Sequence, residues 1–293
     1  MPNVLTRLLD FLRDLLPPPF RADVPVVPVV RLAGAIGVAT PLRPGLMLSS
    51  TARMLERAFE TRNARAVALL INSPGGSPAQ SHLIFRRIRD LAAEKKIPVL
   101  AFIEDVGASG GYMLACAGDE IICDPFSIVG SIGVVGGSFG FVELMDKLGV
   151  ERRLYVSGDR KVMLDPFLPE KPDDVKRIKA LQKDIHEHFI ALVKERRGAK
   201  LKGADKTLFS GEFWTAQTAI DLGLADSVGD LRGALRQRYG KKVRMVSIEA
   251  ERSFLGRKMS GIGLAGLFGS DMALADDLIS ALETRALWSR YGL

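Results

Sequence analysis

The stretch that decides the fold is IPVLAFIEDVGASGGYMLACAGDEIICDP, residues 97–125. It begins with an apolar run at 97–103, passes through the glycine-flanked Ser109 and an apolar segment at 111–117, and ends in a second apolar run at 119–125. Short apolar runs bounded by turn residues are typical of buried strands. The stretch therefore predicts a strand, a turn at Ser109, a short helix and another strand.

The same alternation of strand and helix extends toward the N-terminus. Apolar runs predict strands at 24–36 and 66–72, and helical spacing predicts helices at 49–61 and 79–95. These strands lack a clean alternation of apolar and polar residues, and each precedes a crossover helix. Both features indicate a buried parallel sheet, so we expect an α/β fold.

Three segments frame this alternation. Residues 1–20 place leucines at helical spacing before three prolines, which predicts an amphipathic arm lying on a membrane surface, on the protein itself or on a sister subunit. Residues 170–197 are strongly charged but carry one apolar stripe, which predicts a long surface helix. We divide the chain into this arm at 1–20, a main domain at 21–245, and a tail at 246–293 that is partly helical or poorly ordered.

Composition narrows the classes of function. The 293 residues are 47% hydrophobic and 26% charged, as in globular proteins. The net charge of +7 comes from 41 basic and 34 acidic residues without basic blocks, so we expect no nucleic-acid partner. Cys116 and Cys123 lie in apolar surroundings without metal-ligand spacing, which predicts buried free thiols and no metal site.

No run approaches the about 20 apolar residues that a membrane-spanning helix needs. The N-terminal segment has acidic residues within its apolar part and no small-residue cleavage site, unlike a signal peptide. We therefore expect a cytoplasmic protein without a transmembrane segment or a cleavable signal peptide, whose membrane contact would be peripheral, on the inner membrane.

Ser109 is the first candidate for chemistry. Residues 107–111 match the G-x-S-x-G pattern in which small neighbours allow a sharp turn that exposes a nucleophilic serine. A hydrolase of that type needs a histidine after the serine, and only His186 and His188 follow. Both lie in the predicted charged helix, so we interpret them as solvated or capping residues; an esterase that uses one of them remains an alternative.

Without a histidine, a neutral lysine can activate a serine. A lysine with the usual pKa of about 10.4 is charged at neutral pH, and burial lowers that pKa. Lys161 precedes Val162, Met163 and Leu164 in a stretch without helical charge pattern. This setting favours burial of Lys161 over that of the other lysines.

An acyl transfer also needs backbone N–H groups that stabilise the oxyanion. Gly75 and Gly76 follow the predicted strand at 66–72, and glycines there can turn an N–H outward. Gly110 follows Ser109 at the expected start of a helix, whose positive end favours negative charge. The two segments together predict an oxyanion hole.

These residues together resemble the S49 peptidase family, of the signal peptide peptidase A type. The resemblance covers roughly residues 25–245, and four segments carry it: LLINSPGGSPAQSHLIFRRI, EDVGASGGYMLACAGDEIICDP, SIVGSIGVVGG and SGEFWTAQTAIDLGLADSVG. It implies a Clp protease/crotonase-like fold of repeated β-β-α units with flanking helices. It also implies roles for single residues: Ser109 as nucleophile, Lys161 as general base with Lys171 as the other candidate, Ser131 as the group that orients the lysine amine, and Gly76 and Gly110 as the oxyanion hole.

The resemblance further implies a homo-oligomeric ring or bowl, a peptide or unfolded protein substrate, and no metal or organic cofactor. The function we expect is that of a serine endopeptidase cleaving unfolded or short hydrophobic peptides, such as signal-peptide remnants. Family members that act on signal peptides are generally anchored in the membrane at the N-terminus, whereas residues 1–20 offer only a short arm. Besides the esterase, a catalytically silent scaffold with the same fold is a further alternative.

Overall fold

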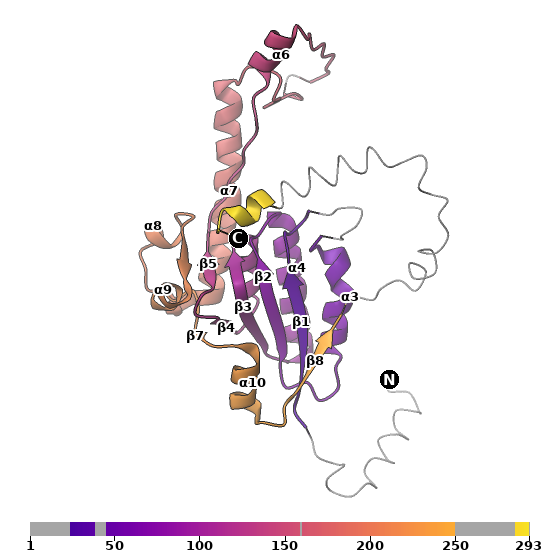
Figure 1. Ribbon diagram of the computed structural model, residues 1–293, viewed down its shortest axis with the longest axis vertical. Coiled ribbons are helices and arrows are strands. Elements are labelled where there is room, and N and C mark those ends of the chain that lie inside the picture. Colours follow the sequence, from indigo (N-terminus) through magenta and orange to yellow (C-terminus); the bar gives the residue numbers. More distant parts are fainter. Residues whose placement is uncertain (1–23, 39–44, 159, 250–284, 293) are drawn as a thin grey trace, which may run out of the picture.

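In the part of the chain that the structure describes, a mainly parallel, eight-stranded β-sheet forms the centre (Figure 1). The computed structural model describes residues 24–38, 45–158, 160–249 and 285–292. Six strands follow the order β6-β5-β3-β2-β1-β8, while β4 pairs with β3 and β7 with β4. Among the described strands, β5 and β6 are the one pair that runs antiparallel. The strands are β1 (Val26–Ala33), β2 (Val67–Ser73), β3 (Val99–Ala108), β4 (Glu120–Cys123), β5 (Ile128–Gly130), β6 (Phe213–Thr215), β7 (Ser227–Val228) and β8 (Arg244–Ile248).

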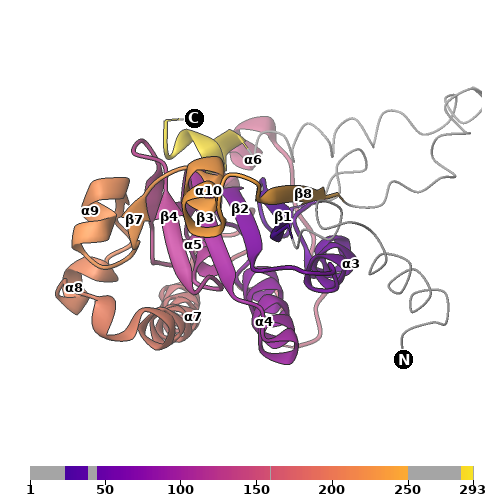
Figure 2. The same ribbon diagram turned by 90° about the horizontal axis from the view of Figure 1, so that it is seen from below.

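Helices cover both faces of this sheet (Figure 2). One face packs against α3, α4, α5 and α7, and the other against α10. The helices are α3 (Leu48–Phe59), α4 (Pro78–Lys95), α5 (Gly110–Ala115), α6 (Val142–Leu148), α7 (Pro172–Arg197), α8 (Asp205–Leu208), α9 (Ala216–Asp221) and α10 (Leu231–Tyr239), with a 3₁₀ turn η1 (Gly198–Lys200). The sheet is thus the middle layer of three.

Strand β3 shows why apolar runs predict this layer. Ala101 and Ile103 join the core beneath α4 and α5, while Leu100 and Phe102 join the core beneath α10. A strand buried on both faces needs apolar residues at successive positions. The α/β class expected from the sequence is confirmed, and the four predicted strands correspond to β1 to β4.

The segment between β5 and α7 projects from this body. Figure 1 shows α6 beyond the end of α7 that lies away from the sheet, and no residue of α6 is buried. The apolar stripe of α7 divides accordingly: Phe189 and Val193 are buried, whereas Leu181 and Ile185 are exposed. The first half of the predicted surface helix therefore belongs to the projection and the second half to the core.

The arm predicted at 1–20 lies outside the described residues, as does most of the tail predicted at 246–293. Of that tail, residues 246–249 and 285–292 are described, and 285–289 form a helical turn against the body (Figure 1). Among the described helices, none is long and apolar enough to cross a bilayer.

Candidate active site

Ser109 lies on a strained turn between β3 and α5. Its φ of 53° falls in the left-handed region that non-glycine residues rarely adopt. The Ser109 N–H donates to the carbonyl of Gly130 (2.8 Å), and the Ser109 carbonyl accepts from Met113 N–H (3.0 Å). The hydroxyl makes no capping hydrogen bond to α5. The backbone is therefore fixed at both ends while the hydroxyl remains available for chemistry.

Glycines make this turn sterically feasible. A Cβ on Gly110 would lie 2.3 Å from Ser81 Oγ, and one on Gly111 would lie 2.4 Å from the Ser73 carbonyl oxygen. Both distances are far below van der Waals contact, so α5 can approach β2 and α4 this closely only with glycine at these positions. The glycines of the G-x-S-x-G pattern therefore allow α5 to pack closely against β2 and α4 around Ser109.

The glycine turn after β2 lies against the same site. Gly75 has φ +96°, and a Cβ on it would come within 2.7 Å of Ser109 Cβ and 2.8 Å of Gly110 N. Gly76 has φ +141° and packs against Ile36, where a Cβ would meet the carbonyl oxygen at 2.1 Å. The first N–H groups of a helix have no partner inside it, so Gly110 N–H can serve an oxyanion beside this turn.

Ser131 lies on the turn after β5, also with a left-handed φ of 54°. Its N–H donates to the Glu212 carbonyl (2.7 Å), and its side chain is almost fully buried. The carboxyl ends of β2, β3 and β5 lie at one edge of the sheet because these strands are parallel. That geometry brings the glycine turn, Ser109 and Ser131 together.

One cavity of about 560 Å³ joins these residues. Its lining comes from the β2–α4 turn, the Ser109 turn, the segment after β5, α7, the segment before β6 and the C-terminal helical turn. The residues are Pro74, Gly76, Pro78, Ser109, Ser131, Gly133, Val134, Val135, His186, Ser210, Gly211, Leu287 and Arg290. The structure therefore brings together Ser109, Ser131 and Gly76 of the predicted site. Gly110 is the residue that follows Ser109 in the sequence.

The structure does not bring Lys161 to this cavity. None of the described residues that line it is a lysine. Lys161 is exposed in a turn between α6 and α7, where its N–H donates to the Gly158 carbonyl (3.1 Å), and Lys171 is exposed at the start of α7. The sequence favoured burial of Lys161; its apolar neighbours are only half-buried because this segment belongs to the projection.

His186 lies in the cavity, although the sequence suggested a solvated or capping residue. Its Nε2 is 3.0 Å from the carbonyl oxygen of Ile132, next to Ser131. His188, two positions further along α7, is exposed. The sequence held a usable signal, because His186 precedes the buried Phe189 and Val193 at helical spacing.

Tyr291 is a second residue that the sequence did not indicate. Its hydroxyl donates to Ser131 Oγ (3.3 Å), and its ring meets Phe213 edge-on with 5.1 Å between centroids. The buried side chain packs on Val106 and Ala108, directly before Ser109. A segment near position 290 thus contributes to a site formed around positions 75–133.

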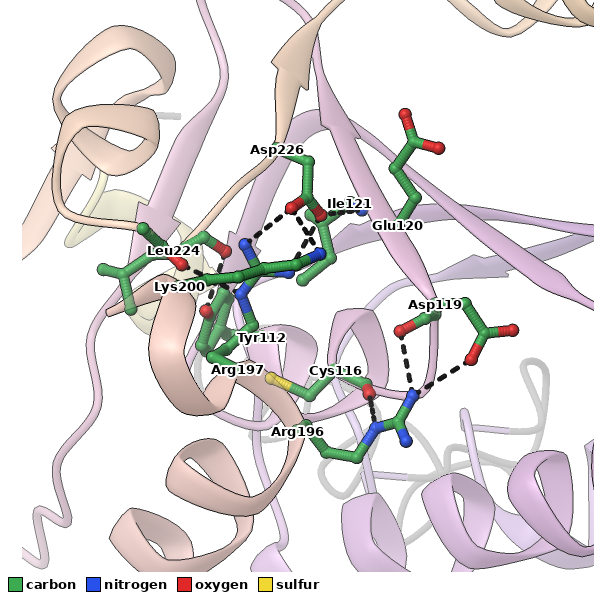
Figure 3. A network of polar contacts seen from close by, with 12 residues as sticks. Tyr112, Cys116, Asp119, Glu120, Ile121, Arg196, Arg197, Lys200, Leu224 and Asp226 are labelled. Atoms are coloured by element: carbon green, nitrogen blue, oxygen red, sulfur yellow. Dashed lines mark hydrogen bonds and ion pairs between the residues drawn. The ribbon is translucent and has the colours of Figure 1, made fainter. Parts of the chain in front are cut away.

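Behind the site, an ion-pair network fixes the end of α7 to the sheet (Figure 3). Arg197, only 3% exposed, donates to both carboxylate oxygens of Asp226 (2.8 and 3.1 Å), and Lys200 donates to Asp226 Oδ1 (2.7 Å). Tyr112, on α5, donates from its hydroxyl to the Leu224 carbonyl (2.8 Å). Helix α5, which follows Ser109, and helix α7, which carries His186, are therefore both bonded to the segment at 223–226.

Burial and charge determine the ionisation of these groups. Burial opposes the charge of Asp226, but hydrogen bonds from Arg197, Lys200 and the Ile121 N–H outweigh it and lower the Asp226 pKa to about 2. Burial raises the pKa of the Cys116 and Cys123 thiols to about 12. Both cysteines are buried and free, as expected. They are structural groups rather than nucleophiles.

Comparisons with known proteins identify the relatives of this chain. The chain is 56% identical over 98% of its length to the Na(+)/H(+) antiporter NhaA of Brucella abortus (strain 2308), and spans 39% of that protein. It is 29% identical over 90% of its length to the chloroplastic serine protease SPPA of Arabidopsis thaliana, and spans 40% of it. The chain thus corresponds to about two fifths of these curated relatives.

Among solved structures, it resembles an alanine mutant of the 1510-N membrane-bound stomatin-specific protease, with a TM-score of 0.47, 18% identity and coverage of 78% of this chain and 99% of the other. The sequence model of Peptidase family S49 matches residues 92–243. This region contains Ser109, Ser131, Lys161 and His186, but neither the glycine turn nor Tyr291. Because the match covers 152 of the 293 residues, the protein belongs to peptidase family S49.

Proposed function

We propose that this chain is a serine endopeptidase that cleaves unfolded or short hydrophobic peptides, such as signal-peptide remnants, with Ser109 as nucleophile and Lys161 as general base. The observation that carries the proposal is the strained Ser109 turn, whose hydroxyl is not used as a helix cap, in one cavity with Ser131 and Gly76. Family membership supports peptidase chemistry at this serine.

The reaction would proceed through an acyl-enzyme. The neutral Lys161 amine takes the Ser109 hydroxyl proton while Oγ attacks the peptide carbonyl. The N–H groups of Gly76 and Gly110 stabilise the resulting oxyanion. The lysine then transfers the proton to the leaving amine as the C–N bond breaks. In the second half, Lys161 takes a proton from water, whose oxygen attacks the ester, and Ser109 regains its proton as the acid leaves.

A single copy leaves Lys161 outside the cavity, so the dyad requires the α6–α7 segment to reach Ser109. We propose that a neighbouring copy supplies this segment within a homo-oligomer. The projection favours such an assembly because it exposes many large apolar side chains: Val135, Phe139, Leu144, Leu148, Val150, Tyr155 and Val156. A closed assembly would also restrict access to extended chains.

The first test compares cleavage of casein and of a hydrophobic peptide pool by the wild type and by variants. Ser109→Ala should lower the rate by more than about a thousandfold. Ser247→Ala, which changes an exposed serine on the edge strand β8, away from the cavity, should leave it unchanged. Full activity in Ser109→Ala would refute the proposal. Absence of cleavage and of phosphonate labelling in the wild type would instead favour the silent scaffold.

The second test concerns the lysine. Lys161→Ala should abolish cleavage, whereas Lys171→Ala should not; the reverse pattern would assign the base to Lys171. Mixing the inactive Ser109→Ala and Lys161→Ala proteins should restore activity, because a mixed assembly pairs an intact Ser109 with an intact Lys161 from another copy. No recovery, in a mixture shown to co-assemble, would place both residues of each dyad in one chain.

A further inference from the structure

We infer that His186 is a positioning residue of the proposed peptidase: through the carbonyl of Ile132 it holds Ser131 in the orientation that the lysine amine requires. The inference rests on the proposed function, and it concerns a residue that would otherwise be a candidate base. Its starting point is the 3.0 Å contact between His186 Nε2 and the Ile132 oxygen.

The direction of this hydrogen bond excludes the contacting nitrogen as a base. A carbonyl oxygen only accepts hydrogen bonds, so Nε2 must carry the proton and donate it. A nitrogen in that state has no lone pair with which to take a proton from Ser109. The contact therefore assigns His186 a donor role toward the backbone, in contrast to the histidine of an esterase.

The contact fixes the turn on one side of Ser131, and a second contact fixes it on the other. The Ser131 N–H donates to the Glu212 carbonyl (2.7 Å), and the Ile132 carbonyl accepts from His186 (3.0 Å). Between these two points Ser131 keeps a left-handed φ of 54°, which costs free energy and persists only when surrounding contacts hold it. Removing the histidine donor releases one of the two points.

Helix α7 is a firm support for the imidazole. One and two turns beyond His186, the side chains of Phe189 and Val193 are buried, and Arg197 forms the buried ion pair with Asp226 at the end of the helix (Figure 3). One turn before His186, Gln182 packs on the same segment, since a Cβ on Gly136 would lie 2.8 Å from its Nε2. This face of α7 therefore runs along residues 132–136.

The test measures peptide cleavage by His186→Ala, His186→Gln and the matched control His188→Ala, which changes an exposed histidine on the same helix. A neutral hydrogen bond corresponds to about a 2- to 12-fold change in rate. His186→Ala should lower kcat by that factor with KM unchanged. His186→Gln should recover most of it, because the glutamine amide can donate to the Ile132 carbonyl. His188→Ala should match the wild type.

A second measurement does not depend on activity. Hydrogen exchange followed on peptides covering 128–136 should be faster in His186→Ala by a similar factor, and close to wild type in His186→Gln. An inactive wild type would refute the proposed peptidase function but would leave the contact between His186 and the Ile132 carbonyl open to this measurement. Unchanged exchange in His186→Ala would overturn the contact itself.

Two results in an active enzyme would overturn the inference. Wild-type kcat in His186→Ala would show that the contact does not influence Ser131. Loss of more than about a hundredfold in both His186→Ala and His186→Gln would show that proton transfer by the imidazole, and not its hydrogen bond, is required.

Discussion

Replacing Asp226 by asparagine should destabilise the protein by about 3 kcal/mol, since removing one partner of a buried ion pair leaves the other charge uncompensated. Arg197 is 3% exposed and donates twice to this carboxylate. We take the lower end of the usual range because Arg197 keeps its bond to the Gly223 carbonyl (2.9 Å). The asparagine oxygen can also still accept from the Ile121 N–H.

Thermal and urea unfolding measure this loss. About 3 kcal/mol corresponds to a fall in Tm of about 6–12 °C for a domain of this size. Asp119→Asn is the matched control, because Asp119 pairs with Arg89 and Arg196 at 42% side-chain exposure and should change stability by less than about 1 kcal/mol. A free energy of unfolding for Asp226→Asn within 1 kcal/mol of wild type would refute the reasoning.

The same carboxylate predicts a pH dependence. Its pKa is about 2 in the folded chain against a model-peptide value of 3.8. A carboxyl whose pKa is depressed by folding stabilises the protein above its unfolded pKa, and this contribution disappears as the pH falls through the folded value. Between about pH 5 and pH 2 the wild type should therefore lose about 2 kcal/mol that Asp226→Asn does not lose. Equal acid sensitivity of the two proteins would contradict this.

Three further changes test the surroundings of the site. Gly75→Ala should reduce peptide cleavage by more than about tenfold, because the alanine Cβ would lie 2.7 Å from Ser109 Cβ and displace that residue. Activity near wild type would show that the turn can rearrange without moving Ser109. Cys116, with its pKa raised to about 12, should react with a thiol reagent at pH 8 only after unfolding in urea, and rapid reaction in the native protein would contradict its burial. Tyr291→Phe keeps the ring but removes the hydroxyl that contacts Ser131 Oγ (3.3 Å) and the Pro74 carbonyl (3.5 Å), so kcat should change by about 2- to 12-fold while Tm falls by no more than about 6 °C. An unchanged kcat would show that the contact with Ser131 does not influence catalysis.

The sequence predicted the central strands well because their burial requires apolar residues on both faces. Strand β3 is the clearest case, although it extends beyond the predicted 97–103 as far as Ala108. Strands β5 to β8 were not predicted. For β5, β6 and β7 the reason is that two or three residues carry too little pattern. The convergence of Ser109, Ser131 and Gly76 follows from topology, because parallel strands end at one edge of the sheet.

What the sequence could not predict depends on contacts between distant segments. His186 lies 54 positions from the carbonyl it meets, and Tyr291 lies 160 positions from Ser131. Neither neighbour can be inferred from local spacing. Lys161 illustrates a different limit, because three apolar residues after it indicated burial, yet the segment extends beyond the core. Its environment depends on what the projection contacts rather than on the local pattern.

The most direct test of the account is covalent labelling of the nucleophile. A fluorophosphonate probe should add one label to the wild-type protein, and mass spectrometry of the digested product should place it on Ser109. Ser109→Ala should remain unlabelled, and Lys161→Ala should label much more slowly because the serine is no longer deprotonated. A label on another residue, or labelling of Ser109→Ala at the wild-type rate, would contradict the claim that Ser109 is the nucleophile.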